Sequence, residues 1–231
     1  MNRVLAATPL PDDSLLLQVS ASPPADLAPG HCYRLEIDGR HRVLPVLDAS
    51  VPEGWLAFRI AAAEATGTRL QRGVTCALHG PLGVPVAAPD GDRRLVLLAD
   101  AAGLPAVLFA TRLGLPVSLA LAGLDDGPAP VRLRPSRFML TGFDGAAIAG
   151  IAALEDAGIP SRLSHPEPLP GCATGDLATL VTQWLDGCSA RVRWERSIAL
   201  LGGPVTLETV TPLLRGRVGH YSVHPAIPTG D

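Results

Sequence analysis

Two short segments carry residue types suited to binding phosphate groups. Arg42 lies in an alternating run, and a planar guanidinium of this kind can hold a diphosphate through paired hydrogen bonds. In Gly67-Thr68, the glycine lets the backbone approach a diphosphate closely and the threonine hydroxyl can donate a hydrogen bond. Each segment also has a plainer interpretation, Arg42 as a solvated strand residue and Gly67-Thr68 as a turn with a helix-starting threonine. The residues alone leave both interpretations open.

A third segment that could take part in ligand binding follows the apolar run from Leu95 to Leu98. There the chain reads Ala99-Asp100-Ala101-Ala102-Gly103-Leu104-Pro105. Two unit negative charges about 4 Å apart repel by roughly 1 kcal/mol in water and by about 4 kcal/mol at an effective dielectric constant of 20. We therefore expect Asp100 to oppose a pyrophosphate bound at this loop, unless its side chain caps the helix from Pro105 or contacts a ribose.

Other candidate groups have weaker support. His220 and His224 lie four residues apart, but Gly219 and Pro225 oppose a helix and no third metal ligand is evident. Asp125-Asp126, followed by Gly127-Pro128, is typical of a turn. The four cysteines are too widely spaced for a metal or cluster site, so we expect free thiols at Cys32, Cys76, Cys172 and Cys188. We also find no nucleophile elbow, zinc-protease helix or nucleotide P-loop.

Composition excludes several function classes. Of the 231 residues, 19 are basic and 22 acidic, and the formal net charge of -3 is spread along the chain, so no basic footprint for nucleic acid is present. All the basic residues are arginine, which removes lysine-based chemistry. No apolar run approaches the roughly 20 residues that span a bilayer, and the first residues lack a secretory pattern, so we expect a cytoplasmic protein without membrane insertion.

The elements expected to position these groups fall into two parts. The first part is a succession of short strand-like runs: 3–8, 14–20, 32–37, 41–47, 55–61 and 74–80. Turn residues separate them, and Asp38-Gly39 is a strong hairpin signal because a tight primed turn requires positive φ. The pattern predicts an antiparallel β-barrel, with 32–37 paired to 41–47.

After the Pro/Gly-rich stretch 80–92, the pattern changes to alternating strands and helices. We expect strands at 95–98, 117–122, 138–141, 161–164 and 197–201, and helices at 105–113, 146–157, 176–185 and 207–214. The stretch from Gly216 onward has little periodicity and carries Pro225 and Pro228. This predicts a parallel-sheet α/β domain. The fold class is therefore β + α/β, with a barrel domain over residues 1–88 and an α/β domain over residues 89–231.

The order of parts resembles the ferredoxin-reductase superfamily, and within it most closely the electron-transfer subunit of bacterial dihydroorotate dehydrogenase. The residues that carry the resemblance are Arg42, Gly67-Thr68, the junction Gly80-Pro81-Leu82-Gly83, the loop and helix start ending at Pro105, and Gly203-Pro204. The likeness extends to about Leu214. It implies a flavin-binding barrel over residues 1–88, an NAD-binding-like α/β domain with a degenerate glycine loop over residues 89–231, and a partner protein subunit.

The resemblance assigns FAD to Arg42, Gly67 and Thr68, and a degenerate nucleotide site to Gly103, Gly203 and Pro204. At the position of the family's flavin-orienting Ser or Thr, this chain has Pro45, which offers neither a hydroxyl nor an N–H. With the loop aligned on Pro105, the family's glycines are replaced by Leu98, Ala99, Asp100 and Ala102, so NAD(P) binding is not expected. The closely spaced cysteines of the family's [2Fe–2S] cluster are absent, and Gly202 replaces the cysteine before Gly-Pro.

Three functions remain open at this stage. The first is a flavin-dependent electron-transfer subunit that exchanges electrons with a partner protein, with Tyr221 as a possible cover for the flavin ring. The second is a cofactor-poor scaffold or regulatory subunit of a multiprotein complex that keeps the reductase fold. The third is binding of a different, smaller or uncharged ligand at the ends of the parallel strands.

Overall fold

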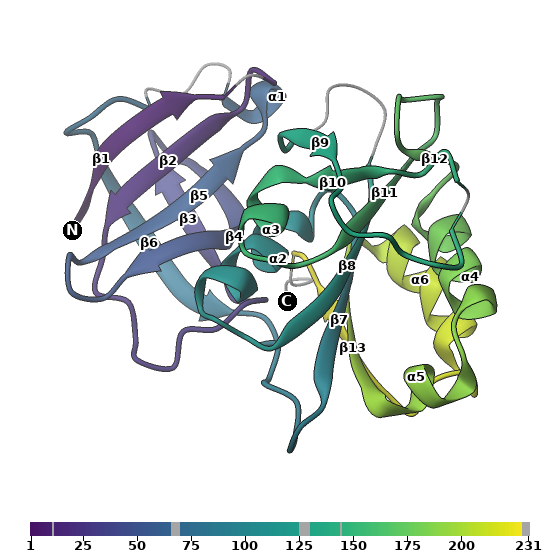
Figure 1. The fold of residues 1–231 in the computed structure, drawn as a ribbon. Helices are drawn as coiled ribbons and strands as arrows, with labels where there is room; N and C mark the ends of the chain where they lie inside the picture. Colours follow the sequence, from purple (N-terminus) through teal and green to yellow (C-terminus); the bar gives the residue numbers. More distant parts are fainter. Residues whose placement is uncertain (11, 66–69, 125–129, 144, 228–231) are drawn as a thin grey trace.

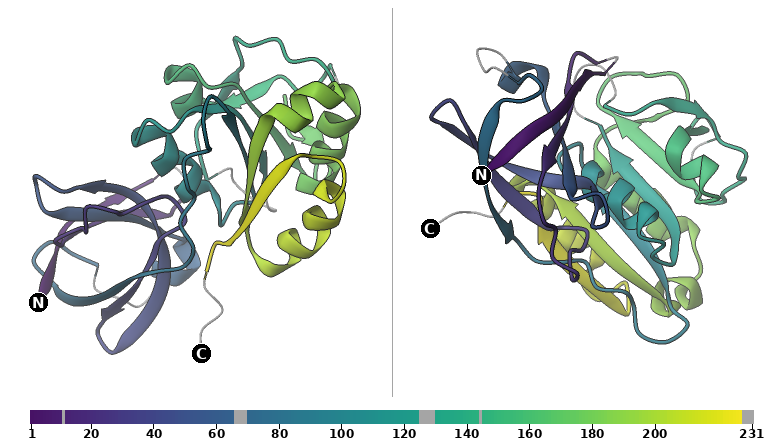
Figure 2. Two further views of the ribbon diagram at one scale, coloured as in Figure 1. Left: turned by 90° about the horizontal axis from the view of Figure 1, so that it is seen from below. Right: turned by 90° about the vertical axis from the view of Figure 1, so that its left-hand side faces the viewer.

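The computed structural model describes residues 1–10, 12–65, 70–124, 130–143 and 145–227. A closed barrel and an α/β unit lie side by side, with helix α2 between them (Figure 1, Figure 2). This confirms the fold class expected from the sequence. No helix among the described residues is long and apolar enough to cross a membrane.

Six strands close the N-terminal barrel in the order β1-β2-β5-β4-β3-β6, and all of their pairings are antiparallel. Alternate residues of each strand face the barrel core, as the period-two pattern requires. The predicted hairpin is confirmed: Ile37 pairs with Arg40, and Asp38 and Gly39 adopt φ of 51° and 71°. The strands are Asn2–Pro9, Leu15–Ser20, Cys32–Ile37, Arg40–Ser50, Trp55–Ile60 and Thr75–Leu82 for β1 to β6, and the short helix Ala62–Ala65 is α1.

The second part is a six-stranded parallel sheet with the order β12-β11-β8-β7-β13-β14. Helices cover both faces, α2 and α3 packing with one apolar cluster and α4 and α6 with the other, because the central strands are apolar throughout. The strands are Arg94–Ala99 (β7), Val117–Gly123 (β8), Ser161–His165 (β11), Ala173–Thr174 (β12), Arg196–Gly202 (β13) and His220–Pro225 (β14). The helices are Leu104–Arg112 (α2), Ala152–Asp156 (α3), Leu177–Gly187 (α4), Ala190–Glu195 (α5) and Pro204–Leu214 (α6).

Two expectations about this domain were wrong, and one strand lies in a stretch with no predicted element. The helix predicted over 146–157 is shortened to α3, because Ala149–Ile151 instead forms strand β10 against β9, Leu133–Pro135. The strand predicted at 138–141 is not formed. The stretch after Gly216 contains β14, which pairs with β13 over six residues although its sequence has no clear periodicity. For β10 and β14, a partner strand elsewhere in the sequence decided the conformation.

The barrel and the α/β unit are joined by close packing. Phe109 of α2 is buried in the barrel core, and Arg112 at the end of the same helix forms an ion pair with Asp48 of β4. The chain also returns to the barrel after β14, where the Cys32 thiol lies 3.1 Å from the Ala226 carbonyl oxygen and donates to it. These contacts hold the carboxyl ends of the parallel strands in a fixed position relative to the barrel.

Candidate functional site

The candidate site is the cleft at the carboxyl ends of the parallel strands, where open α/β sheets bind their ligands. Strands β7 and β13 are neighbours, and each leads directly into a helix, α2 after β7 and α6 after β13. A cleft of about 340 Å³ opens beside the start of α6. Its described lining includes Asp100, Gly203 and Pro204, so the structure brings together three residues that the sequence singled out.

The Asp100 carboxylate bonds to the backbone at the start of both helices. Its Oδ1 accepts a hydrogen bond from the Gly103 N–H at 3.0 Å, and its Oδ2 accepts one from the Gly203 N–H at 2.7 Å. Gly103 and Gly203 are the residues immediately before α2 and α6. Backbone N–H groups at helix starts are the usual receptors for phosphate oxygens. Here an internal carboxylate already accepts from the N–H groups of the two N-cap residues, without forming a side-chain cap to the first turn of either helix.

The glycines around Asp100 are required by close packing. A Cβ on Gly103 would lie 2.4 Å from the Leu201 carbonyl oxygen, and a Cβ on Gly202 would lie 2.7 Å from Asp100 Oδ2. Both separations are far below contact distance, so larger residues would displace the backbone of β13 or the carboxylate. Gly103 thus allows the start of α2 to pack closely against β13, as the last glycine of a nucleotide-binding loop does. The positions before it, Ala99 to Ala102, are not glycine.

A second carboxylate lines the cleft. Asp176 precedes α4 and caps it, its Oδ1 accepting from the Thr179 N–H and the Thr179 hydroxyl, each at 2.8 Å. No basic side chain is present among the described residues that line the cleft. A bound pyrophosphate would therefore face two carboxylates with no local counter-charge, at a cost of roughly 1 to 4 kcal/mol for each pair of charges near 4 Å. The cleft suits an uncharged group better than an anion.

Of the residues that the resemblance assigns to a flavin, the structure describes Arg42 but not Gly67 or Thr68. Arg42 pairs directly with Leu35, which is 1% exposed, and opposite residues of an antiparallel pair point to the same face. The Arg42 side chain is therefore on the inner face at one end of the barrel, where it donates to the Glu64 carbonyl of α1. Pro45 pairs with Cys32 and is half-buried. Gly67 and Thr68 lie outside the described residues.

On the C-terminal strand β14, one histidine is buried and hydrogen-bonded, and the other histidine and the tyrosine are exposed. His224 is buried, its Nδ1 lying 3.0 Å from the Val84 carbonyl oxygen and its Nε2 2.7 Å from the Ser222 hydroxyl. Burial lowers the pKa of His224, and the bond to the Val84 carbonyl opposes that shift. Tyr221 and His220 are exposed. The described residues contain no group of three or more side chains placed to hold a metal ion.

No family model and no curated protein matches the chain. Solved structures do match. The ferredoxin reductase in carbazole 1,9a-dioxygenase superposes with a TM-score of 0.71 at 18% identity, covering 98% of this chain and 68% of that one. The cytochrome P450 reductase of Amycolatopsis gives a TM-score of 0.70 at 17% identity, covering 100% of this chain and 71% of that one. The chain has the ferredoxin-reductase fold.

A further neighbour is similar over its whole length. The ferredoxin NADP+ reductase from Neisseria gonorrhoeae, solved with bound FAD and NADP, gives a TM-score of 0.63 at 15% identity, and the match covers 98% of both chains. These identities establish the fold alone. The finer resemblance to a dihydroorotate dehydrogenase subunit stays a prediction.

Sequence reasoning found Asp100, Gly103 and the Gly203-Pro204 pair but missed two features of the site. Asp176 was included in a helix and not identified as its cap, although Asp followed three residues later by Thr at the start of an apolar periodic run is a recognisable signal. The contact between Asp100 and Gly203 was also missed, because the two residues are 103 positions apart and no local pattern relates them.

Proposed function

We propose that this protein is a ferredoxin-reductase-type electron-transfer subunit that binds FAD at its barrel, exchanges electrons with a partner protein and takes none directly from NAD(P)H. The observation that carries the proposal is the Asp100 carboxylate, which accepts from the Gly103 and Gly203 N–H groups. Those donors are the ones that a pyridine-nucleotide pyrophosphate needs. With Asp176 beside them, they leave the cleft unsuited to such a ligand.

The residues present fit a flavin diphosphate in part. The proposal is supported by the contact of Arg42, whose guanidinium donates to the Glu64 carbonyl. Glu64 precedes Gly67 by three residues in the sequence. An arginine and a Gly-Thr pair are residue types suited to a diphosphate, since the guanidinium neutralises charge and the backbone and hydroxyl can donate hydrogen bonds. When bound, FAD supplies one- and two-electron chemistry. The chain's own contribution is to bind it and to exclude pyridine nucleotide.

A subunit role is supported by the absence of iron–sulfur cysteines from the sequence. No cysteine follows Cys188, so the four cysteines that hold an iron–sulfur cluster in the dihydroorotate-type subunit have no counterparts here. If the chain also binds no pyridine nucleotide, as proposed, its flavin would exchange electrons with another protein. We therefore propose a partner subunit that delivers or removes the electrons.

A cofactor-poor scaffold is the second candidate, and two observations favour it. Pro45 has neither an N–H nor a hydroxyl for the flavin ring edge, and Arg42 already donates to a backbone carbonyl on the inner face of the barrel. A subunit of this kind would keep the fold for the sake of its partner contacts and carry no redox group.

An absorption spectrum and a nucleotide titration test the proposal. Protein purified with added FAD is expected to show the visible bands of an oxidised flavin, and NADH and NADPH should leave those bands unchanged under anaerobic conditions while dithionite bleaches them. Rapid bleaching by either nucleotide would contradict the proposed exclusion by Asp100. A colourless protein after reconstitution would select the scaffold instead.

A pair of arginine variants tests the flavin site itself. Arg42→Gln is expected to weaken FAD binding by about tenfold to a hundredfold, the worth of a charge-assisted contact to phosphate. Arg72→Gln removes the same charge from an exposed position close to the segment 66–69 and should leave the affinity nearly unchanged. Equal FAD affinity in both variants would remove Arg42 from the proposed site.

A further inference from the structure

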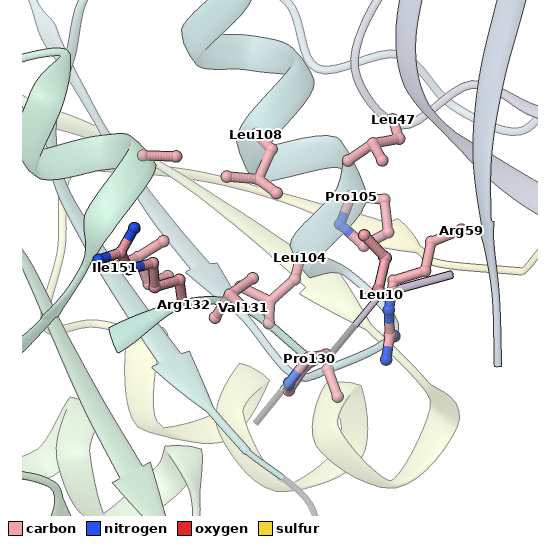
Figure 3. A pocket seen from close by; sticks show the side chains of 12 residues that line it. Leu10, Leu47, Arg59, Leu104, Pro105, Leu108, Pro130, Val131, Arg132 and Ile151 are labelled. Carbon is pink, nitrogen blue, oxygen red and sulfur yellow. The ribbon is translucent and has the colours of Figure 1, made fainter. Parts of the chain in front are cut away.

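A second cavity lies between the barrel and the α/β unit, and its lining shares no residue with that of the strand-end cleft, although Ala101 neighbours Asp100 in sequence. Its volume is about 190 Å³. Figure 3 shows Leu104 and Leu108 of α2 facing Val131, with Leu47 of β4 at one side and Ile151 at the other. The surface is largely apolar and both domains contribute to it. The functional residues considered above do not line it.

The size and lining of the cavity suit one ring or a short branched chain. In another protein, an engineered cavity of about 150 Å³ lined by Leu, Ile and Phe stays dry and binds benzene, so 190 Å³ admits a molecule of that size. Sites for larger organic ligands are usually about 300 to 1,000 Å³. A whole dinucleotide or flavin is therefore too large for this cavity.

Two arginines line the cavity, and they differ in their partners. Arg59 forms an ion pair with Asp12, and its Nε donates to the Ser14 hydroxyl at 3.0 Å, so its charge is compensated. Within the part of the chain that the structure describes, the Arg132 guanidinium has no hydrogen bond or ion pair. Arg134, two residues further along the chain, is by contrast paired with Asp156 at 2.7 Å. Arg132, which is exposed, thus brings to the lining of an apolar cavity a positive charge that pairs with no acid among the described residues.

We propose that this cavity binds a small apolar monocarboxylate of benzoate size, with its ring or chain between the domains and its carboxylate on Arg132. The apolar side chains supply the burial, and the planar guanidinium fork matches the carboxylate. Because α2 on one side and the barrel on the other both contact the ligand, binding stabilises the packing of the two domains together.

Calorimetry and thermal unfolding of the full chain with sodium benzoate test this assignment. We expect a dissociation constant of about 1 mM or tighter for this small ligand. At saturation the unfolding midpoint should rise by about 5 °C. Benzyl alcohol has the same ring without the charge and is expected to bind at least about tenfold more weakly. No benzoate uptake at 10 mM (about ten times the expected constant), or equal affinity for the alcohol, would overturn the proposal.

Three variants separate the parts of the site. Arg132→Gln should reduce benzoate affinity to that of the alcohol, whereas Arg134→Gln, which removes a nearby charge that does not line the cavity, should change it less than twofold. Ala153→Leu places a larger side chain at an exposed helical position of the lining and should abolish binding of both probes. Each variant is first shown to unfold cooperatively. Unaltered benzoate binding by Arg132→Gln or by Ala153→Leu would contradict the assignment.

Discussion

Replacing Asp100 by alanine is expected to destabilise the protein strongly, although the residue lies at the end of a strand and is only half-buried. The substitution removes both acceptors, at 3.0 Å and 2.7 Å from the Gly103 and Gly203 nitrogens, and so leaves two backbone N–H groups without their partner. A hydrogen bond to a charged group contributes about 1.5 to 3 kcal/mol, and partial exposure to water reduces that value. We expect a total loss of about 2 to 4 kcal/mol.

Thermal and urea unfolding measure this loss directly. For a chain of this length, 2 to 4 kcal/mol corresponds to a fall in the unfolding midpoint of about 5 to 15 °C. Asp100→Asn keeps one acceptor and should lose about half as much, because its amide nitrogen cannot accept from the second N–H. Asp92→Ala, which removes the same charge from an exposed loop, should change stability by less than about 0.5 kcal/mol. An equally small effect for Asp100→Ala would refute the reasoning.

Three further outcomes follow from the structure. Gly103→Ala should destabilise by about 3 kcal/mol in urea unfolding because its Cβ meets a strand carbonyl at 2.4 Å, whereas Gly145→Ala, with open space around it, should be nearly neutral. Burial lowers the pKa of His224 in the folded state, so the unfolded chain binds more protons and stability should fall as the pH drops below about 6.5. His224→Gln should flatten that fall between about pH 7 and pH 5, and an unchanged slope would exclude His224 as its source. Burial raises the pKa of Cys32 to about 12, so thiol reagents should label the half-buried Cys188 first and reach Cys32 only on unfolding, as read by mass spectrometry.

The sequence was sufficient to predict the barrel. Its six strands are short, alternate apolar and polar residues, and are separated by turn residues such as Asp38-Gly39, so the local pattern and the final structure agree. The central strands β7, β8 and β13 were also predictable, since continuous apolar runs of that length fit strands buried on both faces. The free state of all four thiols followed from their spacing.

Segments with weak patterns were decided by partners far away in sequence. Ala149–Ile151 becomes a strand because it pairs with Leu133–Pro135, although its alanine-rich sequence favours a helix. The strand His220–Pro225 exists because the edge of β13 offers it six residues of pairing. Propensity scales carry no information on such distant partners.

The sequence by itself determined that a carboxylate would stand at Asp100, in a loop where a pyrophosphate-binding chain has glycines. It did not determine what the carboxylate contacts. Only the tertiary structure brings the end of β7 beside the end of β13, so that Asp100 reaches the N–H of Gly203, 103 residues away. The reason is physical: residue type sets which groups can donate or accept a hydrogen bond, whereas the pairing of parallel strands decides which of those groups meet.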